Sequence, residues 1–332
     1  MAVRELAALG MDLGGTATRV LVVDASGHRR GAGQAGGGNP VAHQQDVWAT
    51  AMDQALGRAL RESGPVTVGS VVVGVAGGGA LGDSDVAASF ERIIRSHVGR
   101  RCPIQLTGDA VVAFAAGASE PDGTVLIAGT GAAAAAIHDR RPAREVDGNG
   151  WLLGDDGSGF WIGREAVRAV LAELDGRGPV TSLRPLIAES LLSRHPAETE
   201  ARKTRNEIIR AVNARPPVTL ARLAPLVSRC ASHGDQVALG IARTAVDHLI
   251  AAVQVVRSPR ETTPIVVTGG VAAGDHLVGA LLRQRLAARW PGCVRAVRDG
   301  VAGAAWLALR ALPGIDEEMA AELHHLVQLS GS

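Results

Sequence analysis

DLGGTATR, residues Asp12–Arg19, is the stretch that decides the fold of the first part of this chain. Apolar runs flank it, LAALGM before and VLVV after, and a turn follows at Asp24–Gly27. Two apolar runs joined by a short glycine-containing segment are typical of a β-hairpin rather than of a strand followed by a helix. We therefore predict two adjacent strands with a tight glycine loop between them.

The glycine loop of this hairpin has the composition of a phosphate-binding loop. Gly14 and Gly15 allow backbone N–H groups to come close to an anion, and Thr16 adds a hydroxyl donor. Asp12, at the end of the preceding strand, can hold Mg²⁺ through water. Glycine turns are also common without any ligand, so the phosphate function depends on partner motifs further along the chain.

Length, composition and charge limit the classes of protein to which this chain can belong. Its 332 residues suit two domains, and 46% hydrophobic with 20% charged residues is typical of a globular protein. A net charge of +1 indicates neither a nucleic-acid-binding nor a membrane-attracted surface. We find no leader and no apolar run of about 20 residues. Because the three cysteines, Cys102, Cys230 and Cys293, are far apart, we expect reduced thiols in a cytoplasmic protein.

Strands, glycine loops and helices alternate along the chain in two similar blocks. The first block predicts the hairpin, then a glycine-rich loop at 31–40, a helix at 47–63, a strand at 70–76, a helix at 86–98 and a strand at 103–108. The second block predicts a strand and loop at 125–131, a strand at 132–137, helices at 160–176 and 237–256, a strand at 264–270, and helices at 276–290 and 301–312. This repetition predicts an α/β architecture of two lobes with a cleft between them.

We place the first lobe at residues 1–118 and the second at 119–312. A helical insert is expected at about 176–234, where the chain is rich in Arg, Pro and Ala. The amphipathic C-terminal segment, 313–332, is expected to pack back on the first lobe as a helix.

A second candidate phosphate loop follows the strand that starts at Val125. Gly129, Thr130 and Gly131 form a glycine–hydroxyl turn like that of the first loop. Two such loops from two lobes can hold a triphosphate from both sides. A further glycine segment, TGGVAAG at Thr268–Gly274, follows a strand and can lie against the purine and ribose of a nucleotide.

Asp109, in the segment LTGDA, lies at the end of a predicted strand between the two phosphate loops. A carboxylate placed there in a cleft can accept the proton of an attacking hydroxyl during phosphoryl transfer. The alternative is a helix N-cap, where aspartate is favoured.

The densest polar cluster is GNGWLLGDDGSGFWIG, residues 148–163. Asn149, Asp155 and Asp156 stand there among glycines and tryptophans, and carboxylates suit a hydroxyl-rich ligand because each accepts several hydrogen bonds. The alternative is that Asp156 or Ser158 caps the following helix. We find no GxxxxGK[ST] loop, no HExxH or CxxC pair and no GxSxG motif in the sequence.

In their order along the chain, DLGGTATR, TGDA, IAGTG, GWLLGDDGSGFWIG and VTGG resemble the motifs of the actin-like sugar kinase superfamily. They are most similar to its N-acetylglucosamine kinase and BadF/BadG-type branch. The resemblance covers the chain from Asp12 to about Ala305 and is weakest in the helical insert. It implies two actin-like (ribonuclease H-like) α/β lobes, each with a mixed sheet, and a central cleft for ATP and sugar. It also implies Mg²⁺ as cofactor, a sugar substrate and a homodimer.

The resemblance assigns roles to single residues. Asp109 would take the proton from the sugar 6-hydroxyl, and Arg19 would steady the first phosphate loop or the phosphates unless it is a solvated strand residue. The first lobe would hold sugar and phosphate and the second the nucleotide. The nucleotide would be bound by Gly14, Gly15, Thr16, Gly129, Thr130, Gly131, Gly269 and Gly270. The hexose pocket would be lined by Asn39, Gly77, Gly78, Thr130 and Asp155, together with Asn149 and Asp156 of the polar cluster.

Two positions depart from the family pattern. Ala132 follows GTG where a serine is usual, so that one hydroxyl donor is missing. Asp156 stands where glutamate is frequent, which shortens the reach of the second acidic side chain by one methylene.

The sequence favours glucosamine as the acceptor over N-acetylglucosamine, because Asp147, Asp155 and Asp156 would surround an ammonium group. This preference depends on Asp147 facing the ligand. The alternatives are N-acetylglucosamine, a BadF-type ATPase activator and a non-enzymatic sugar sensor. An activator of that type needs closely spaced cysteines for an iron–sulfur cluster, which this sequence does not have.

Overall fold

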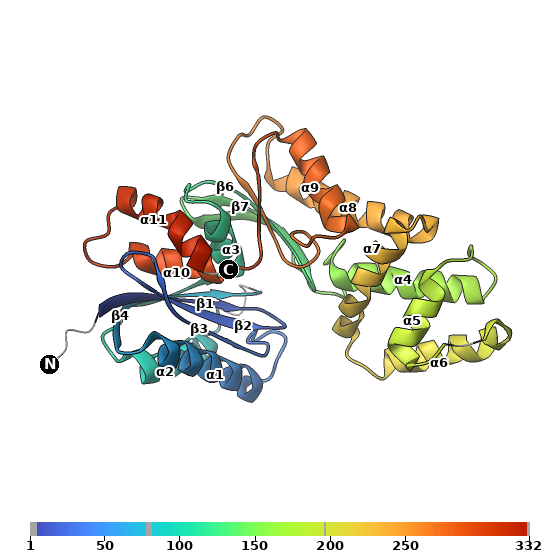
Figure 1. Cartoon of the computed structure of the whole chain (residues 1–332), viewed down its shortest axis with the longest axis horizontal. Coiled ribbons are helices and arrows are strands. Elements are labelled where there is room, and N and C mark those ends of the chain that lie inside the picture. The colour runs from blue at the N-terminus through green and yellow to red at the C-terminus, as the bar shows by residue number, and fades with distance from the viewer. Residues whose placement is uncertain (1–4, 78–81, 196, 331–332) are drawn as a thin grey trace. The chain divides into compact units, whose positions relative to one another are not determined.

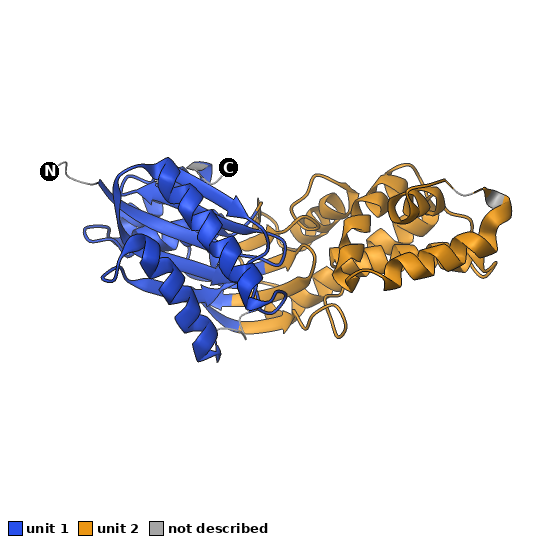
Figure 2. Ribbon diagram, turned by 90° about the horizontal axis from the view of Figure 1, so that it is seen from below, with its two compact units in different colours: residues 1–125, 137–143, 299–332 blue, residues 126–136, 144–298 orange. Residues whose placement is uncertain are grey.

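A computed structural model of the protein describes residues 5–77, 82–195 and 197–330. The predicted site residue Gly78 lies outside these residues. The chain divides into two compact units (Figure 2), of which unit 1 comprises residues 1–125, 137–143 and 299–332 and unit 2 comprises residues 126–136 and 144–298. The chain passes between the units inside three strands and again after Arg298. These strands are β6 (Gly123–Ala128), β7 (Ala132–His138) and β8 (Arg141–Asp147).

Among the described residues, unit 1 contains a five-stranded mixed sheet with the strand order β3-β2-β1-β4-β5. The strand β2 pairs antiparallel with β1 and β3, whereas β4 pairs parallel with β1 and β5. The elements of this unit are β1 (Glu5–Leu13), β2 (Thr18–Asp24), β3 (Arg29–Ala35), α1 (Gln45–Ser63), β4 (Val66–Val75), α2 (Ser84–Val98), β5 (Ile104–Gly108), α3 (Asp109–Gly117), α10 (Val301–Arg310) and α11 (Glu317–Ser330).

The opening hairpin is confirmed, with Asp12 directly opposite Arg19. Side chains alternate between the two faces of a strand, and β1 uses both faces for the core. Leu9 and Met11 pack with α1 and α2, while Ala8 packs with α10. Helices therefore cover both faces of the sheet, α1 and α2 on one and α10 and α11 on the other (Figure 1).

The expected loop at 31–40 is partly wrong, because its first half forms the strand β3. A Cβ on Gly33 would lie 2.0 Å from the backbone oxygen of Ala55 in α1. The helix thus lies directly on the backbone of this strand, and a glycine is needed for the close approach. A glycine-rich segment usually predicts a loop, but here its glycines allow α1 to pack closely on β3.

We expect Gly33→Ala to lower the free energy of unfolding by about 1–3 kcal/mol, because α1 and β3 must move apart to accept the new methyl group. Gly36→Ala is the matched control, since a Cβ at Gly36 would have no atom within 4 Å. Urea denaturation of both variants measures the difference. Equal stability of the two would contradict the close packing of α1 on β3.

The helix expected at 301–312 in the second lobe is α10, and it lies in unit 1 instead. Its small residues allow it to approach the sheet closely, since a Cβ on Gly10 of β1 would lie 2.1 Å from the backbone nitrogen of Ala305. Residues 119–125 and 137–143 also belong to unit 1. The observed division therefore differs from a single boundary at 118.

The C-terminal helix α11 packs on α10 within unit 1. The indole N–H of Trp306 donates to the carbonyl oxygen of Ala320 at 2.6 Å. Val327 is fully buried in the same hydrophobic cluster as α10. A polar bond and an apolar contact thus fix this helix to the face of the sheet opposite α1.

The second sheet has the strand order β10-β9-β6-β7-β8, and helices of unit 2 form a separate core that contains Trp161, Leu249 and Trp290. The expected insert at 176–234 consists of short helices. The remaining elements are α4 (Gly159–Leu174), α5 (Leu183–Leu192), η2 (Glu198–Glu200), α6 (Ala201–Asn213), η3 (Pro217–Leu223), α7 (Ala224–Ser232), α8 (Gln236–Val256), β9 (Ile265–Thr268), α9 (Leu277–Arg289) and β10 (Val294–Val297).

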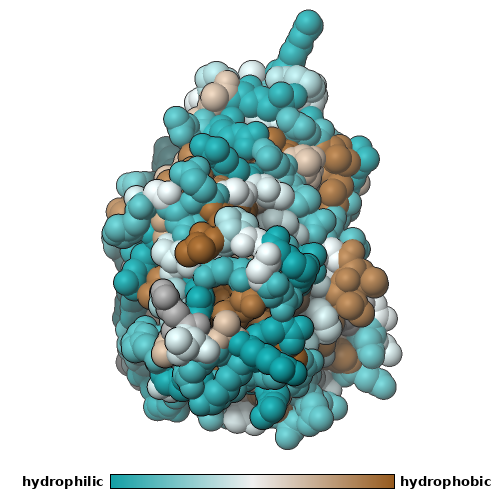
Figure 3. Space-filling model, turned by 90° about the vertical axis from the view of Figure 1, so that its right-hand side faces the viewer, coloured by the Kyte–Doolittle hydropathy of each residue, from teal (hydrophilic) through white to brown (hydrophobic). Residues whose placement is uncertain are grey.

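The expectation of no apolar run of about 20 residues is wrong for one described helix, α8, which is long and apolar enough to cross a membrane by length and composition. One face of this helix, which includes Ala242, Val246 and Leu249, is buried against other helices of unit 2. The face of the molecule drawn in Figure 3 is mostly hydrophilic, and its hydrophobic residues form small separate groups.

Candidate functional site

The first candidate phosphate loop is closed by its own backbone and exposes its tip. The Gly14 N–H donates to the carbonyl oxygen of Ala17 at 2.9 Å, so this amide is not available to a ligand. Gly15 and Thr16 are exposed. The ring nitrogen Nε2 of His43 donates to the Gly15 carbonyl oxygen at 2.7 Å and fixes the loop from one side. The tip can therefore offer a phosphate the amides of Gly15 and Thr16 and the threonine hydroxyl.

Asn39 and Gly77, two predicted sugar-pocket residues, lie close together in unit 1. The Asn39 side-chain oxygen accepts the N–H of Val41 at 2.8 Å, and its amide nitrogen would lie 3.9 Å from a Cβ on Gly77. Because the oxygen of Asn39 is used within the loop, its NH₂ group is the part that can donate to a ligand.

Asp12 and Arg19 meet a residue that the sequence analysis missed, Asp299 at the start of α10. The Asp12 Oδ2 atom accepts the N–H of Gly300 at 3.1 Å, and Arg19 Nε lies 3.2 Å from Asp299 Oδ2. Arg19 is thus an ion-pair partner within the site rather than only a solvated strand residue. Two carboxylates and one guanidinium lie together at the end of β1.

Burial, together with the nearby carboxylate of Asp299, raises the pKa of Asp12 to about 6, although the Gly300 N–H and Arg19 act in the opposite direction. A pair of facing carboxylates favours a proton or a cation between or beside them. Mg²⁺ is commonly held by one or two carboxylates together with waters and phosphates, so Asp12 and Asp299 fit this metal.

The raised pKa predicts how stability depends on pH. Asp12 holds its proton more tightly in the folded protein than in the unfolded chain, so stability should fall as pH rises from about 4 to about 6. In the presence of a chelator at pH 8, Asp12→Asn should therefore increase the free energy of unfolding by about 1–3 kcal/mol. Urea denaturation at pH 8 and pH 4 measures this gain, which should shrink at pH 4. A gain that is larger at pH 4 would contradict the assignment.

Asp109 is the first residue of α3 and comes directly after β5. The N-cap position of this helix is occupied by Gly108, so Asp109 does not need to serve as the cap. Asp109 is partly exposed and lies in the first turn of α3. This placement suits a group that accepts a proton.

The second candidate phosphate loop forms a tight turn in unit 2. The Gly129 N–H donates to the carbonyl oxygen of Gly131 at 2.9 Å, and the Ala132 N–H donates to Asp155 Oδ1 at 3.1 Å. Within the described residues, these bonds leave the backbone N–H groups of Thr130 and Gly131 available to bind an anion. Ala132, which lacks the usual serine hydroxyl, uses its backbone to bind Asp155.

The candidate nucleotide loop lies beside this turn. A Cβ on Gly129 would be 3.9 Å from both Gly269 Cα and Gly270 N. The loop is held by two residues that the sequence analysis missed: His276 Nε2 donates to the Gly270 carbonyl oxygen at 2.6 Å, and Arg283 donates to two carbonyl oxygens of residues 272 and 274. The structure therefore brings the second phosphate loop and the nucleotide loop together within one unit.

Asp147, which directly precedes the polar cluster, has a different role from the acidic residues within it. Asp147 accepts the backbone N–H of Asp155 at 2.7 Å through Oδ1 and that of Asp156 at 2.9 Å through Oδ2. Both of its oxygens are thus used inside the protein, and the reason to prefer an ammonium-bearing sugar no longer holds. Burial raises the pKa of Asp155, with the Ala132 N–H lowering it and the charges of Asp147 and Asp156 raising it.

The other polar residues of the cluster differ in burial and in their hydrogen bonds. Ser158 is the N-cap of α4, where its hydroxyl accepts the N–H of Trp161 at 3.2 Å. The capping alternative is therefore correct for Ser158 and not for Asp156. Asn149 and Asp156 are exposed. Asp155 is the half-buried carboxylate of the cluster, and it lies against Gly131, where a Cβ would be 2.9 Å from its oxygens.

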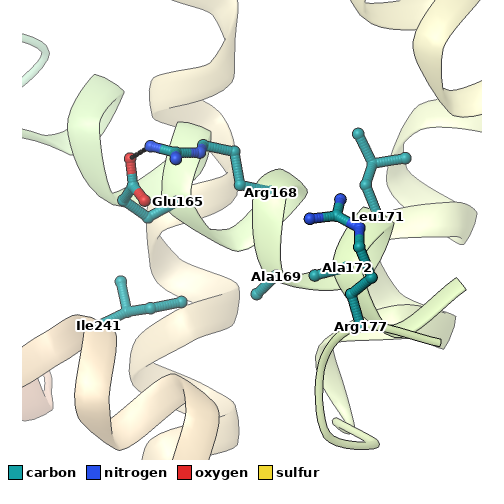
Figure 4. A pocket seen from close by; sticks show the side chains of 7 residues that line it. All are labelled: Glu165, Arg168, Ala169, Leu171, Ala172, Arg177 and Ile241. Carbon is teal, nitrogen blue, oxygen red and sulfur yellow. Dashed lines mark hydrogen bonds and ion pairs between the residues drawn. The ribbon is translucent and has the colours of Figure 1, made fainter. Parts of the chain in front are cut away.

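Two of the surface cavities lined by described residues bear on the choice of site. One of about 260 Å³ borders Arg19 and Asp299 in unit 1. The other, of about 400 Å³, lies at α4 and α8 (Figure 4) and contains none of the predicted site residues. Its Glu165 already pairs with Arg168 at 3.1 Å. We assign the candidate site by its chemistry and not by cavity size.

Of the residues missed in the sequence, only Asp299 has a signal that was available. It stands shortly before an apolar helix, and Asp109 similarly opens the apolar helix α3. His43, His276 and Arg283 contact loop carbonyl groups, and nothing in their spacing indicates this.

Comparison with known proteins assigns this chain to one family. A family model described as the BadF/BadG/BcrA/BcrD ATPase family matches residues 9–308. The N-acetyl-D-glucosamine kinase of Dictyostelium discoideum is 28% identical over 320 residues, which cover 91% of this chain and 97% of the relative. An N-acetylmuramic acid/N-acetylglucosamine kinase of Clostridium acetobutylicum is 28% identical over 243 residues, 71% of this chain and 73% of the relative.

Solved structures share the fold. A candidate N-acetylglucosamine kinase from Chromobacterium violaceum has a TM-score of 0.71 and 23% identity, covering 93% of this chain and 100% of that one. A ROK family glucokinase from Streptomyces griseus, in complex with glucose and AMPPNP, has a TM-score of 0.56 and 18% identity, covering 92% of this chain and 100% of that one. The expected actin-like α/β fold with one sheet in each lobe is confirmed.

Proposed function

The chain belongs to the BadF/BadG/BcrA/BcrD ATPase family, and we propose that it is an ATP-dependent N-acetylglucosamine kinase that phosphorylates the 6-hydroxyl of the sugar. The observation that carries this proposal is the contact of three segments in unit 2. The second phosphate loop at Gly129–Gly131 lies against the nucleotide loop at Gly269 and Gly270 and also against the carboxylate of Asp155. Groups suited to a nucleotide and to a hydroxyl-rich ligand therefore share one loop.

Each unit supplies chemistry for the proposed reaction. In unit 1, Asp109 accepts the proton of the attacking hydroxyl, and Asn39 donates to the sugar. In unit 2, Asp155 accepts hydrogen bonds from sugar hydroxyls, and Thr130 and Gly131 donate backbone N–H groups to phosphate oxygens. Phosphoryl transfer needs little covalent participation by the protein, so alignment and charge stabilisation by these groups account for catalysis.

Mg²⁺ is part of the proposal, with Asp12 and Asp299 as the side chains that hold it. When bound, the ion neutralises the negative charge of the phosphates. Arg19 pairs with Asp299 and thereby holds the Asp299 carboxylate near Asp12. Asp12 keeps its own orientation through the N–H of Gly300.

N-acetylglucosamine replaces glucosamine as the proposed acceptor for two reasons. The relatives from Dictyostelium discoideum and Clostridium acetobutylicum are named as kinases of N-acetylated sugars. In addition, Asp147 is occupied by backbone amides, so the carboxylate that was expected beside an ammonium group does not face the ligand.

A panel of acceptors tests the proposal. The protein is incubated with ATP and Mg²⁺ and with N-acetylglucosamine, glucosamine, N-acetylmannosamine, N-acetylmuramic acid or glucose, and release of ADP is followed. We expect kcat/KM for N-acetylglucosamine to exceed that for glucosamine by about tenfold or more. Absence of sugar-dependent ADP release with all five acceptors would refute the kinase, and a preference for glucosamine would refute the acceptor.

No observation favours the iron–sulfur ATPase activator. Cys102, Cys230 and Cys293 are each buried, and no group of three or more metal-ligating side chains occurs within residues 5–77, 82–195 and 197–330. We propose in addition that the kinase acts in the cytoplasm as a homodimer without nucleic-acid or membrane partners. Light scattering coupled to size-exclusion chromatography tests the dimer.

A further inference from the structure

The carboxylate of Asp147 binds two consecutive backbone amides of the loop that carries Asp155 and Asp156, the acidic loop. Its Oδ1 atom accepts the N–H of Asp155 at 2.7 Å, and its Oδ2 atom accepts the N–H of Asp156 at 2.9 Å. Hydrogen bonds to an ionised acceptor are shorter and stronger than neutral ones. A single side chain thus fixes the backbone on both sides of the Asp155 Cα atom.

Asp155 needs such support because its backbone is left-handed, with a φ of 57°. Residues with a side chain adopt this region at an energetic cost. The other contacts of Asp155 continue the same network: its carbonyl oxygen accepts the N–H of Ser158 at 3.1 Å, and its carboxylate accepts the N–H of Ala132 at 3.1 Å. Its side chain is thereby directed at Gly131 of the second phosphate loop.

Asp147 is itself held in place by its neighbours in the chain and by the loop that it binds. It ends β8, and the N–H of the next residue, Gly148, donates to the carbonyl oxygen of Ala132 at 2.9 Å. A Cβ on Gly154 would lie 2.2 Å from Asp147 Oδ1. Both oxygens of this half-buried carboxylate therefore face the backbone of Asp155 and Asp156.

We infer that Asp147 is a positioning residue that holds the sugar-binding carboxylate of Asp155 against the second phosphate loop. The inference rests on the proposed kinase function, in which Asp155 contacts the sugar. Asp147 does not touch substrate. It acts through two backbone amides, and its loss should weaken sugar binding more than nucleotide binding.

The test compares Asp147→Ala and Asp147→Asn with a matched control, Glu145→Ala. Glu145 is an exposed acidic residue two positions earlier on the same strand. Kinetics are measured with N-acetylglucosamine varied at saturating ATP and with ATP varied at saturating sugar. We expect Asp147→Ala to raise the KM for sugar by about tenfold or more and the KM for ATP by less than about threefold. Asp147→Asn, which keeps one acceptor atom, should lie between it and the wild type, and Glu145→Ala should match the wild type.

A double-mutant cycle with Asp155→Asn separates positioning from a general structural defect. If Asp147 acts through the Asp155 carboxylate, Asp147→Ala should add less than about threefold to the sugar KM of Asp155→Asn. Additive effects, or an unchanged sugar KM in Asp147→Ala, would overturn the inference. If Asp147→Ala does not fold, as judged by thermal denaturation, the cycle is run with Asp147→Asn. An inactive wild type would refute the proposed function instead, so the two failures are distinct.

Discussion

Asp109→Asn is expected to lower kcat for phosphorylation of N-acetylglucosamine by about 10²–10⁴-fold, with a KM for the sugar that changes by less than about threefold. Asparagine has nearly the shape of aspartate but cannot take a proton from the 6-hydroxyl. The fold should tolerate the change, because the N-cap of α3 is Gly108 and not Asp109. Steady-state kinetics measure kcat, and calorimetric titration with N-acetylglucosamine checks that binding is retained.

Asp85→Asn is the matched control for this variant. Asp85 is an exposed aspartate in the first turn of α2, so the same chemical change is made in the first turn of another helix in unit 1. It should leave kcat unchanged. A kcat near the wild-type value in Asp109→Asn would remove Asp109 from the role of base.

The elements with the clearest apolar patterns were predictable from the sequence. The hairpin of β1 and β2 and the buried strands β4, β6 and β9 each have an apolar run bounded by glycine or a turn. The strands β8 and β10 were missed because their sequences, RPAREVD and VRAV, are largely polar or short. Edge strands of this kind carry little hydrophobic signal, since one face or both faces remain in water.

The placement of α10 was not predictable from chain order. It follows unit 2 in the sequence, yet it packs on β1 through Gly10 and Ala305. The run VAGAAW at its start contains small residues that allow close packing against another backbone. Such a run predicts close packing against another element, but it does not identify that element.

The sequence proposed loops and acidic residues for the candidate site, whereas the direction of their hydrogen bonds was not predictable. The motif at 148–163 identified a cluster of acidic residues, and spacing alone placed Asp147 beside the ligand. The structure turns Asp147 inward onto two backbone amides. Similarly, Asp12 was a metal candidate from its position at a strand end, whereas its partner Asp299 lies 287 positions later in the chain and becomes adjacent only through the packing of α10.

Asp155→Asn is expected to raise the KM for N-acetylglucosamine by about 10- to 100-fold, because hydrogen bonds to a charged acceptor contribute about 1.5–3 kcal/mol. The asparagine side-chain oxygen can still accept the N–H of Ala132, so the loop should keep its conformation. Asp156→Asn should change this KM by less than about threefold, since the side chain of Asp156 is exposed and only its backbone amide joins the network. The pair of variants thus distinguishes two acidic residues that the motif alone treats alike.

The dependence of sugar binding on pH gives this last prediction a second measurement. Because burial raises the pKa of Asp155, its carboxylate takes up a proton at a higher pH than an ordinary aspartate does. The protonated form is a weaker acceptor for sugar hydroxyls, so the KM for N-acetylglucosamine should rise as pH is lowered toward that pKa. In Asp155→Asn this rise should disappear, while any effect of pH on the ATP side of the reaction remains. If the sugar KM of Asp155→Asn follows the same pH profile as the wild type, a different group binds the hydroxyls.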